Sequence, residues 1–173
     1  MKRSTLLLAL PFLLLLFAQN TCSSTSGGTQ PGDGKFRVFY VSPTGDNNNP
    51  GTRDKPWATP GYGARQLRAG DTLVILPGRY ILSRYDEDII VPQNSGTPQA
   101  WITIKGEEND KPVLVGRNDL LVAIDISGKS YIRIENLEIT SDNNAPFRNG
   151  IQVLGRSIRN VHIHSSAQER LIF

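Results

Sequence analysis

The sequence predicts an all-β fold in which short parallel strands stack into a coil, and three observations lead to it. The first is a repeat: residues 123–140 and 150–164 each hold an aliphatic segment that ends at a glycine, followed by a strand with an asparagine corner. The two corners, Asn136 and Asn160, give this repeat an offset of 24 along the chain. A repeat of roughly 20–30 residues built from strands and Gly/Asn corners is typical of a solenoid.

The second observation is alternation after these corners. Every second residue that follows Asn136 and Asn160 is aliphatic, which gives each strand one buried and one wet face. An asparagine at a corner tolerates left-handed backbone, and its side chain can bond an amide of the next coil. Ile124 and Ile151, at an offset of 27, mark the same repeat in the preceding strands.

The third observation is the scarcity of helix and hairpin signals. No apolar stripe with a 3.6-residue period follows Arg68, and the one Asn-Gly pair that leads directly into a strand, Asn149-Gly150, lies in a longer loop. Two similar segments can arise by chance, and a meandering sandwich is then the alternative fold. The expected elements are a polar loop at 42–55, a marginal helix within 61–68, and strands at 36–41, 72–76, 79–82, 89–91, 101–105 and 113–115.

The first 35 residues differ from the rest. Lys2 and Arg3 precede an apolar run, residues 6–18, that is too short to span a bilayer but is typical of a secretory signal. We therefore expect a signal peptide at 1–22, a disordered Ser/Thr/Gly linker at 23–35 and one domain at 36–173. The protein is then exported, to the cell surface or the extracellular space.

Cys22 is the only cysteine, so the sequence holds no disulfide framework. Its position between the apolar run and the linker is that of a lipid-modified cysteine, although residues 19–21 are a poor version of the small-residue box of bacterial lipoproteins. Ordinary cleavage nearby is the favoured interpretation, and lipidation is the alternative. A lipid anchor at Cys22 is the one contact with a membrane that the sequence suggests.

The charge balance argues against a nucleic-acid partner. Of the 19 basic residues, Lys2 and Arg3 lie in the signal segment, so 17 remain against 16 acidic residues. No basic stripe and no recognition helix are visible. The last coils keep a mild basic bias that is compatible with an acidic polysaccharide but does not require one. The basic residues are Lys129, Arg133, Arg148, Arg156 and Arg159, against Asp125, Glu135, Glu138 and Asp142.

Five motifs stand out between residues 38 and 165, namely Phe39-Tyr40-Val41-Ser42-Pro43-Thr44-Gly45-Asp46, Asn49-Pro50-Gly51-Thr52, Lys55-Pro56-Trp57-Ala58-Thr59, Ala69-Gly70-Asp71-Thr72-Leu73-Val74-Ile75-Leu76-Pro77-Gly78-Arg79-Tyr80 and Ile102-Thr103-Ile104-Lys105-Gly106. With these motifs the chain resembles secreted right-handed parallel β-helix proteins of the pectate-lyase-like and chondroitinase-B-like group, including the N-terminal domain typical of these proteins. The resemblance implies a right-handed parallel β-helix of a few coils. The motifs are more specific for the fold than for a reaction.

The chain departs from this group in two ways. Only residues 60–67 are available for the helix that caps the open end, so we expect a short or irregular cap. The chain also stops at Phe173 without a segment that resembles a C-terminal cap, and solenoids need polar end caps. We therefore interpret it as a truncated N-terminal part of such a protein.

The resemblance implies β-elimination in a uronate-containing polysaccharide as the parent activity. In that chemistry a basic side chain removes the proton beside the sugar carboxylate, and calcium neutralises the carboxylate. No segment matches the catalytic coils of the group, so no catalytic residue is assigned and activity of this chain alone is not expected. The alternatives are a non-catalytic glycan-binding or adhesin solenoid at the cell surface, and an inactive gene fragment.

Two candidate sites follow from the residues. Asp46 and Asn48 carry oxygen ligands that suit calcium, with an ordinary polar turn as the alternative. His162 and His164 share one face, and the offset of 24 places Glu138 beside His162. Together with Arg133, these side chains form a candidate patch for a glycan or a transition metal, and an exposed ladder of unrelated polar residues is the alternative.

Overall fold

The structure is a computed structural model that describes residues 36–141 and 147–164. The predicted signal peptide, the linker and Cys22 lie outside these residues. Within them, no helix is long and apolar enough to cross a bilayer. The elements, in chain order, are β1 (Val38–Val41), α1 (Pro60–Gln66), β2 (Thr72–Ile75), β3 (Arg79–Leu82), β4 (Ile102–Gly106), β5 (Val113–Gly116), β6 (Val122–Asp125), β7 (Ile132–Glu135), β8 (Glu138–Ser141), β9 (Asn149–Gln152) and β10 (Val161–His164).

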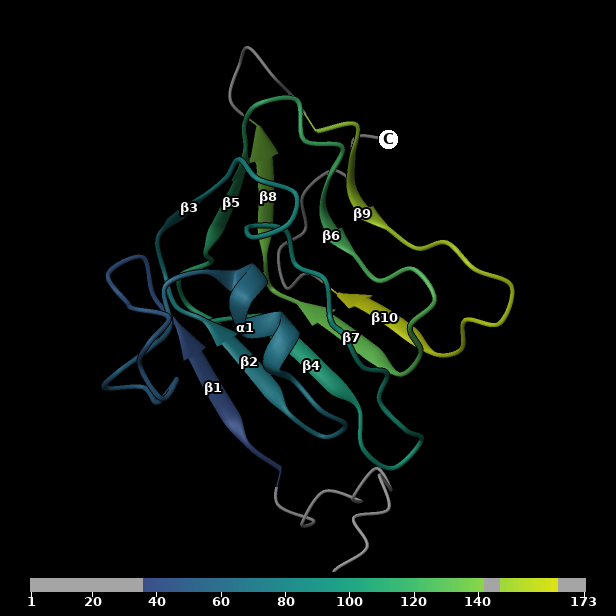
Figure 1. Cartoon of the computed structure of the whole chain (residues 1–173). Helices are drawn as coiled ribbons and strands as arrows, with labels where there is room; N and C mark the ends of the chain where they lie inside the picture. The colour runs from purple at the N-terminus through teal and green to yellow at the C-terminus, as the bar shows by residue number, and fades with distance from the viewer. Residues whose placement is uncertain (1–35, 142–146, 165–173) are drawn as a thin grey trace, which may run out of the picture. The chain divides into compact units, whose positions relative to one another are not determined.

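The strands form three parallel sheets. Sheet A has the order β1-β2-β4-β7-β10, sheet B has the order β3-β5-β8, and sheet C contains β6 and β9. From β2 onward, consecutive strands of the chain belong to different sheets, so the chain winds from sheet A to B to C and returns to A one coil further on (Figure 1). In the first coil an isolated bridge between Ile90 and Ile124 takes the place of a sheet C strand. A solenoid of about four turns results, which confirms the predicted architecture.

The coils of sheet A are longer than the predicted repeat. The offset between paired residues is 31 for β2 and β4, 30 for β4 and β7, and 29 for β7 and β10, as given by the pairs Thr72↔Thr103, Ile102↔Ile132 and Ile132↔Val161. The shorter repeat inferred from Asn136 and Asn160 is therefore wrong. In sheet C, Ile124 pairs with Ile151, and the predicted spacing of these two residues is confirmed.

The two asparagines mislead because they occupy different corners. Asn136 follows β7, on the way to sheet B, whereas Asn160 precedes β10, on the way from sheet C. The residue that aligns with Asn160 in the coil below is Tyr131. All three residues have positive φ, at 55°, 51° and 57°, so the predicted left-handed backbone at the asparagines is confirmed. The Asn136 side chain donates a hydrogen bond to the carbonyl of Glu107 in the preceding coil.

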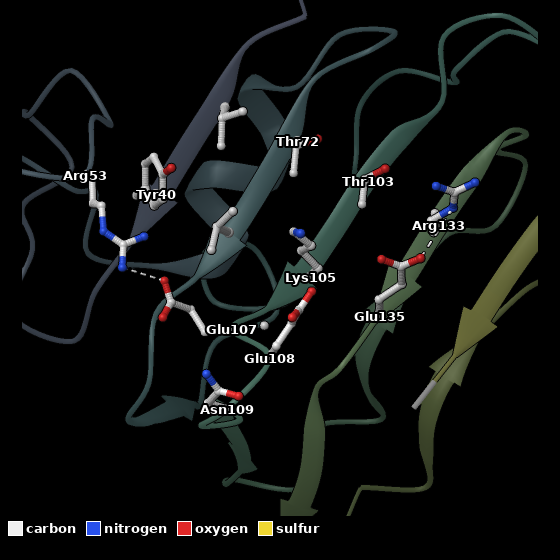
Figure 2. A pocket seen from close by; sticks show the side chains of 13 residues that line it. Tyr40, Arg53, Thr72, Thr103, Lys105, Glu107, Glu108, Asn109, Arg133 and Glu135 are labelled. Atoms are coloured by element: carbon white, nitrogen blue, oxygen red, sulfur yellow. Dashed lines mark ion pairs between the residues drawn. The ribbon is translucent and has the colours of Figure 1, made fainter. Parts of the chain in front are cut away.

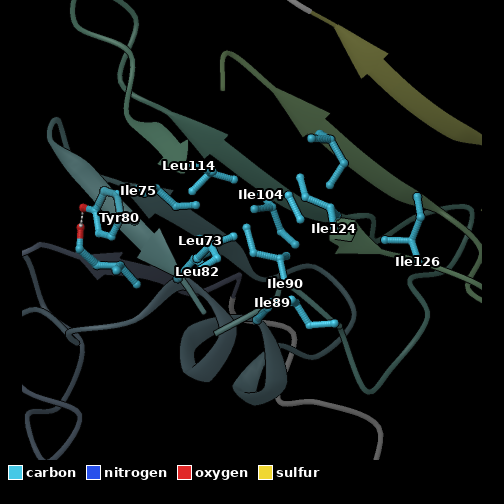
Figure 3. Packing of buried hydrophobic residues seen from close by; sticks show 14 of the residues in the cluster. Leu73, Ile75, Tyr80, Leu82, Ile89, Ile90, Ile104, Leu114, Ile124 and Ile126 are labelled. Carbon is cyan, nitrogen blue, oxygen red and sulfur yellow. Dashed lines mark hydrogen bonds between the residues drawn. The ribbon is translucent and has the colours of Figure 1, made fainter. Parts of the chain in front are cut away.

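The inward side chains form one apolar core along the coil axis. In sheet A the aligned residues Leu73, Ile104 and Ile134 are 0%, 0% and 2% exposed, and Leu114 of sheet B and Ile124 of sheet C point to the same interior (Figure 3). Branched aliphatic side chains stacked over one another at the strand spacing fill most of this interior, and the polar atoms of Tyr80 and Trp57 in the same cluster donate to backbone carbonyls. The alternation in the sequence therefore predicts the inward face correctly, although in β10 Val161 is only partly buried and Ile163 is 56% exposed.

Helix α1 is the only helix of the described residues. Pro60 occupies its first turn, where a missing N–H costs nothing, and Gly63 lets it approach β2, because a Cβ there would lie 2.9 Å from Leu73 Cδ1. Ala64 and the C-capping Leu67 are fully buried. The helix packs on β1 and β2 and has seven residues, so the expected short cap is confirmed.

Candidate functional site

Two ladders of side chains run along the outer face of sheet A. Because alternate residues of a strand point to opposite faces, the residues between the buried positions face outward. One ladder joins Thr72, Thr103, Arg133 and His162 in register, and the other joins Val74, Lys105, Glu135 and His164. Neighbours in a ladder are about 4.8 Å apart. Residues from successive coils are thereby brought into contact distance.

A long corner between two strands forms a border beside these ladders. The corner between sheets A and B holds three residues in the first coil (76–78) and two in the third (136–137), but six in the second (107–112). The extra residues place Glu107, Glu108 and Asn109 at the end of β4, beside the outer ladders (Figure 2). Side chains from the corner and the sheet therefore border one shared hollow.

This hollow is a polar groove of about 600 Å³. It lies across the outer face of four neighbouring strands, β1, β2, β4 and β7, and it is bounded by Arg53 from the loop that follows β1 (Figure 2). Its lining residues are Val38, Tyr40, Arg53, Thr72, Val74, Thr103, Lys105, Gly106, Glu107, Glu108, Asn109, Arg133 and Glu135.

Some charged groups of the groove form ion pairs with each other, and others do not. Arg53 forms a 2.7 Å ion pair with Glu107 and lies 5.4 Å from the centre of the Tyr40 ring. The hydrogen bond to Glu107 raises the pKa of the Arg53 guanidinium above its ordinary value, so Arg53 stays charged. Arg133 Nε is 3.5 Å from Glu135 Oε1. Lys105 has neither a hydrogen bond nor an ion pair with its side chain inside the described ranges, so its ammonium group is open to a ligand.

An aromatic cluster adjoins the groove on the side of β10. Trp101 packs edge to face with Tyr131, at 5.8 Å between ring centres, and with His162, at 5.9 Å. The Arg133 guanidinium lies 5.2 Å from the centre of the Trp101 ring. Arg133 thus links the cluster to the groove, because it belongs to both.

Three of the four residues of the predicted glycan patch come together. Arg133, His162 and His164 lie on the outer face of sheet A, where His162 is beside Arg133 and His164 is beside Glu135. The predicted neighbour Glu138 lies elsewhere: it begins β8 and pairs with Val113 in sheet B. The pairing of Glu138 with His162 is wrong because it rested on the repeat between the two asparagines. The role of the patch in binding stays a prediction.

The predicted calcium residues build a turn. Asp46 Oδ1 accepts hydrogen bonds from the Asn48 backbone N–H at 2.8 Å and from its side-chain amide at 2.9 Å. Across residues 36–141 and 147–164 no group of three or more His, Cys, Asp or Glu residues is arranged to hold a metal ion. A calcium site that includes Asp46 and Asn48 stays a prediction.

Sequence reasoning missed the residues that make the groove. Arg53 and Glu107 lie outside the quoted motifs, and Lys105 lies in a motif that indicates the fold and no role in binding. Each is an ordinary surface residue by type. The signal that could have found them is the unequal corner length, because alignment of the strands of sheet A in their true register leaves 107–112 as an extra segment at the end of β4.

Comparison with known proteins places the chain in a family. It is 32% identical over 86 residues to the uncharacterized protein YwoF of Bacillus subtilis (strain 168). These aligned residues cover 50% of this chain and 17% of YwoF. Among solved structures, the GH136 lacto-N-biosidase of Eubacterium ramulus superposes with a TM-score of 0.54 and 19% identity over 75% of this chain. A rhamnogalacturonan lyase superposes with a TM-score of 0.48 and 21% identity over 60% of it.

The chain covers 27% of the lacto-N-biosidase and 28% of the lyase, so it spans only a small part of each. At 19% identity, the likeness to the lacto-N-biosidase shows the fold alone. The family match is broader, since it runs through all the strands from β1 to β10. Residues 39–171 match the family described as Pel9A-like, right handed beta helix region, and the chain therefore belongs to this family, as its opening motif predicts.

Proposed function

We propose that the chain is the N-terminal β-helix part of an exported protein that acts on polysaccharides, and that the groove on sheet A binds the glycan. The observation that supports this most directly is the groove itself. A polar trough across four parallel strands suits an extended polymer better than a compact ligand, because its length comes from repeated coils. Export rests on the signal pattern in residues 1–22.

The groove offers the donors that a sugar chain needs. Thr72 and Thr103 contribute hydroxyl groups in one ladder, and the ammonium of Lys105 stands between Val74 and Glu135 in the other. A lysine without an ion-pair partner is ready to bind a carboxylate, since no internal salt bridge has to be broken first. Lys105 therefore supports a uronate-containing polysaccharide as the ligand.

The parent reaction that fits such a ligand is β-elimination. A base removes the proton beside the uronate carboxylate, the electron pair moves to form a double bond in the ring, and the bond to the neighbouring sugar oxygen breaks. Cations near the carboxylate stabilise the charge that develops before the bond breaks. Calcium is the cofactor that the family resemblance implies for this task.

Binding to oligogalacturonate by titration calorimetry tests the groove. We expect Lys105→Gln to weaken binding about two- to five-fold, because one exposed charge contact is lost. The matched control is Lys55→Gln, an exposed lysine outside the lining residues, which should bind like the parent chain. Equal effects of the two variants, or no binding by the parent chain, would contradict the proposal.

The reaction is tested separately. The ultraviolet absorbance of unsaturated uronate is followed on pectate and on alginate, with calcium and after chelation. A calcium-dependent rise supports β-elimination by this chain. Binding without turnover supports the non-catalytic glycan-binding solenoid, which uses the same groove.

A further inference from the structure

The two halves of the groove differ in chemistry. The lining residues that β4 and β7 turn outward are mostly charged, and they are Thr103, Lys105, Arg133 and Glu135. The lining residues that β1 and β2 turn outward carry no charge, and they are Val38, Tyr40, Thr72 and Val74. The groove therefore has a charged half on β4 and β7 and an apolar half on β1 and β2.

The apolar half is accessible but small. Val38 is 49% exposed, and it is the one lining residue among the exposed large hydrophobic side chains of the described ranges. Val74 is 7% exposed, so it adds only a little apolar surface between the strands. The guanidinium of Arg53 lies over the half-buried Tyr40, 5.4 Å from the ring centre, and limits the space on that side. A surface of this size suits a group of one or two carbon atoms better than a whole ring.

The charge that borders the apolar half is already compensated. Arg53 forms its 2.7 Å ion pair with Glu107, so an apolar group placed beside Arg53 does not strip solvent from an unpaired charge. In the charged half, by contrast, Lys105 has no such partner among the described residues. The two halves are thus suited to different parts of one ligand.

A ligand must cross the strands to reach both halves. Tyr40, Val74 and Lys105 stand in register on β1, β2 and β4, and Figure 2 shows Tyr40 and Lys105 on separate strands of the sheet. Two strand spacings separate Tyr40 from Lys105, which is about 10 Å. A carboxylate bound by Lys105 and an apolar group bound at Val38 therefore belong to different sugars of the same glycan chain.

We infer that Val38, Tyr40 and Val74 form a subsite for a small apolar ester group of the glycan, a methyl or an acetyl group, one part of the chain away from the sugar whose free carboxylate binds Lys105. The inference rests on the proposed function, because the subsite belongs to the same groove. It narrows the ligand to an acidic glycan in which some of the sugars are esterified and others are free.

The size of the expected preference follows from the apolar area. Removing one methyl or methylene group from water at a protein surface favours binding by about three- to five-fold. Because Val38 is half exposed before the ligand arrives, both surfaces lose water in the contact. An acetyl group leaves every carboxylate of the glycan free, whereas each methyl ester removes one charge that Lys105 could bind.

Titration calorimetry with three galacturonate oligomers of equal length tests the preference: the unsubstituted, the O-acetylated and the partly methyl-esterified oligomer. We expect one or both esterified oligomers to bind about three- to five-fold tighter than the unsubstituted one, and the tighter one identifies the source of the apolar group. Mild saponification of the same sample removes the ester groups and should return the affinity to that of the unsubstituted oligomer. This comparison needs no variant of the protein.

Val38→Thr tests the subsite itself, because threonine keeps the shape of valine and replaces one methyl group with a hydroxyl. The ratio of the affinities for the esterified and the unsubstituted oligomer should fall to about one. The matched control is Val153→Thr, a valine that is 38% exposed and lies outside the groove, and it should keep the ratio. Lys105→Gln should weaken the binding of the acetylated and the unsubstituted oligomer alike, so the ratio between these two should also be kept.

The outcomes separate this inference from the proposed function. Absence of binding by all three oligomers would overturn both. Equal affinity for all three would overturn the inference alone, as would a preference that survives saponification or the Val38→Thr substitution, or one that Val153→Thr also removes. Thermal melts of the variants show whether a change in binding comes from unfolding.

Discussion

Two polar regions of the molecule use the same kinds of residue in opposite ways. In the opening loop, residues 42–57, polar groups are bonded inside the protein: Asn47 Oδ1 accepts from the backbone N–H of Ala58 at 2.9 Å, and the Asn49 side chain donates to the Pro56 carbonyl. In the groove, Lys105 lacks such a partner among the described residues. Residue type therefore does not distinguish a structural loop from a binding surface, whereas unused donors and acceptors do.

The difference predicts where substitutions act. Removing a group from the opening loop should lower the free energy of unfolding, because its partners become buried without a hydrogen bond. Removing a group from the groove should leave stability almost unchanged and should alter binding. Three substitutions test how sharp this division is.

The largest effect is expected for Trp57→Ala. Trp57 is 6% exposed, stacks on Phe39 at 4.8 Å, packs against Tyr62 at 5.5 Å, and donates its indole N–H to the Asn49 carbonyl at 2.7 Å. Its removal should cost about 3–5 kcal/mol of unfolding free energy, measured by urea denaturation.

The control for this substitution is the half-buried Trp101→Ala on the outer face, for which about 1–2 kcal/mol is expected, since less apolar area returns to water. Equal losses for the two tryptophans would show that the opening loop is no more structural than the outer face.

A smaller effect is expected for Tyr80→Phe. The Tyr80 hydroxyl donates to the carbonyls of Leu76, at 2.8 Å, and of Val41, at 3.1 Å, and Val41 is the residue from which the opening loop starts. The loss of this hydroxyl, whose one proton is shared between the two carbonyls, should cost about 1 kcal/mol of unfolding free energy.

The same residue predicts a pH dependence. Burial raises the pKa of Tyr80 above its ordinary value of 10.0. Between the unfolded and folded pKa values the unfolded state binds fewer protons, so stability should fall as the pH rises above about 10. Urea denaturation at about pH 8 and pH 10.5 measures this fall, which should be smaller in Tyr80→Phe. An identical fall in the variant would mean that other groups cause it.

The smallest effect is expected where the two regions meet. The side chain of Arg53 extends from the opening loop and forms an ion pair with Glu107, which borders the groove. The two side chains are 59% and 30% exposed. An exposed pair of this kind contributes about 0–1 kcal/mol, so Arg53→Ala should hardly change the melting temperature. A double-mutant cycle with Glu107→Gln, at low and high salt, isolates the pair. A coupling free energy well above about 1 kcal/mol would show that this border of the groove belongs to the folding core.

The fold was predictable because its signals are local. Alternating aliphatic residues predict the buried face of β4 and β7, and the short helix follows from the few residues available between Pro60 and Leu67. The predicted strand at 89–91 is reduced to a single bridge at Ile90. The opening motif carried the family resemblance, which the match over residues 39–171 confirms.

The stacking register was not predictable in the same way, because two kinds of corner accept the same residue. Asn136 and Asn160 both have left-handed backbone, but the position that truly aligns with Asn160 holds Tyr131, a residue that rarely has positive φ. The error moved Glu138 into the candidate patch. It also hid the groove, which appears only when the strands of sheet A are aligned in their true register.

The long corner at 107–112 has a consequence for how such a protein can change. Neighbouring strands stay in register on both sides of it although the other two corners of this edge are shorter. Loop length there is therefore decoupled from the scaffold, and the side-chain amide of Asn136 secures the start of the corner through the Glu107 carbonyl. Grafting a shorter or longer segment at this point should reshape the rim of the groove while the coils beneath it keep their structure. One β-helix scaffold could then bind different polymers.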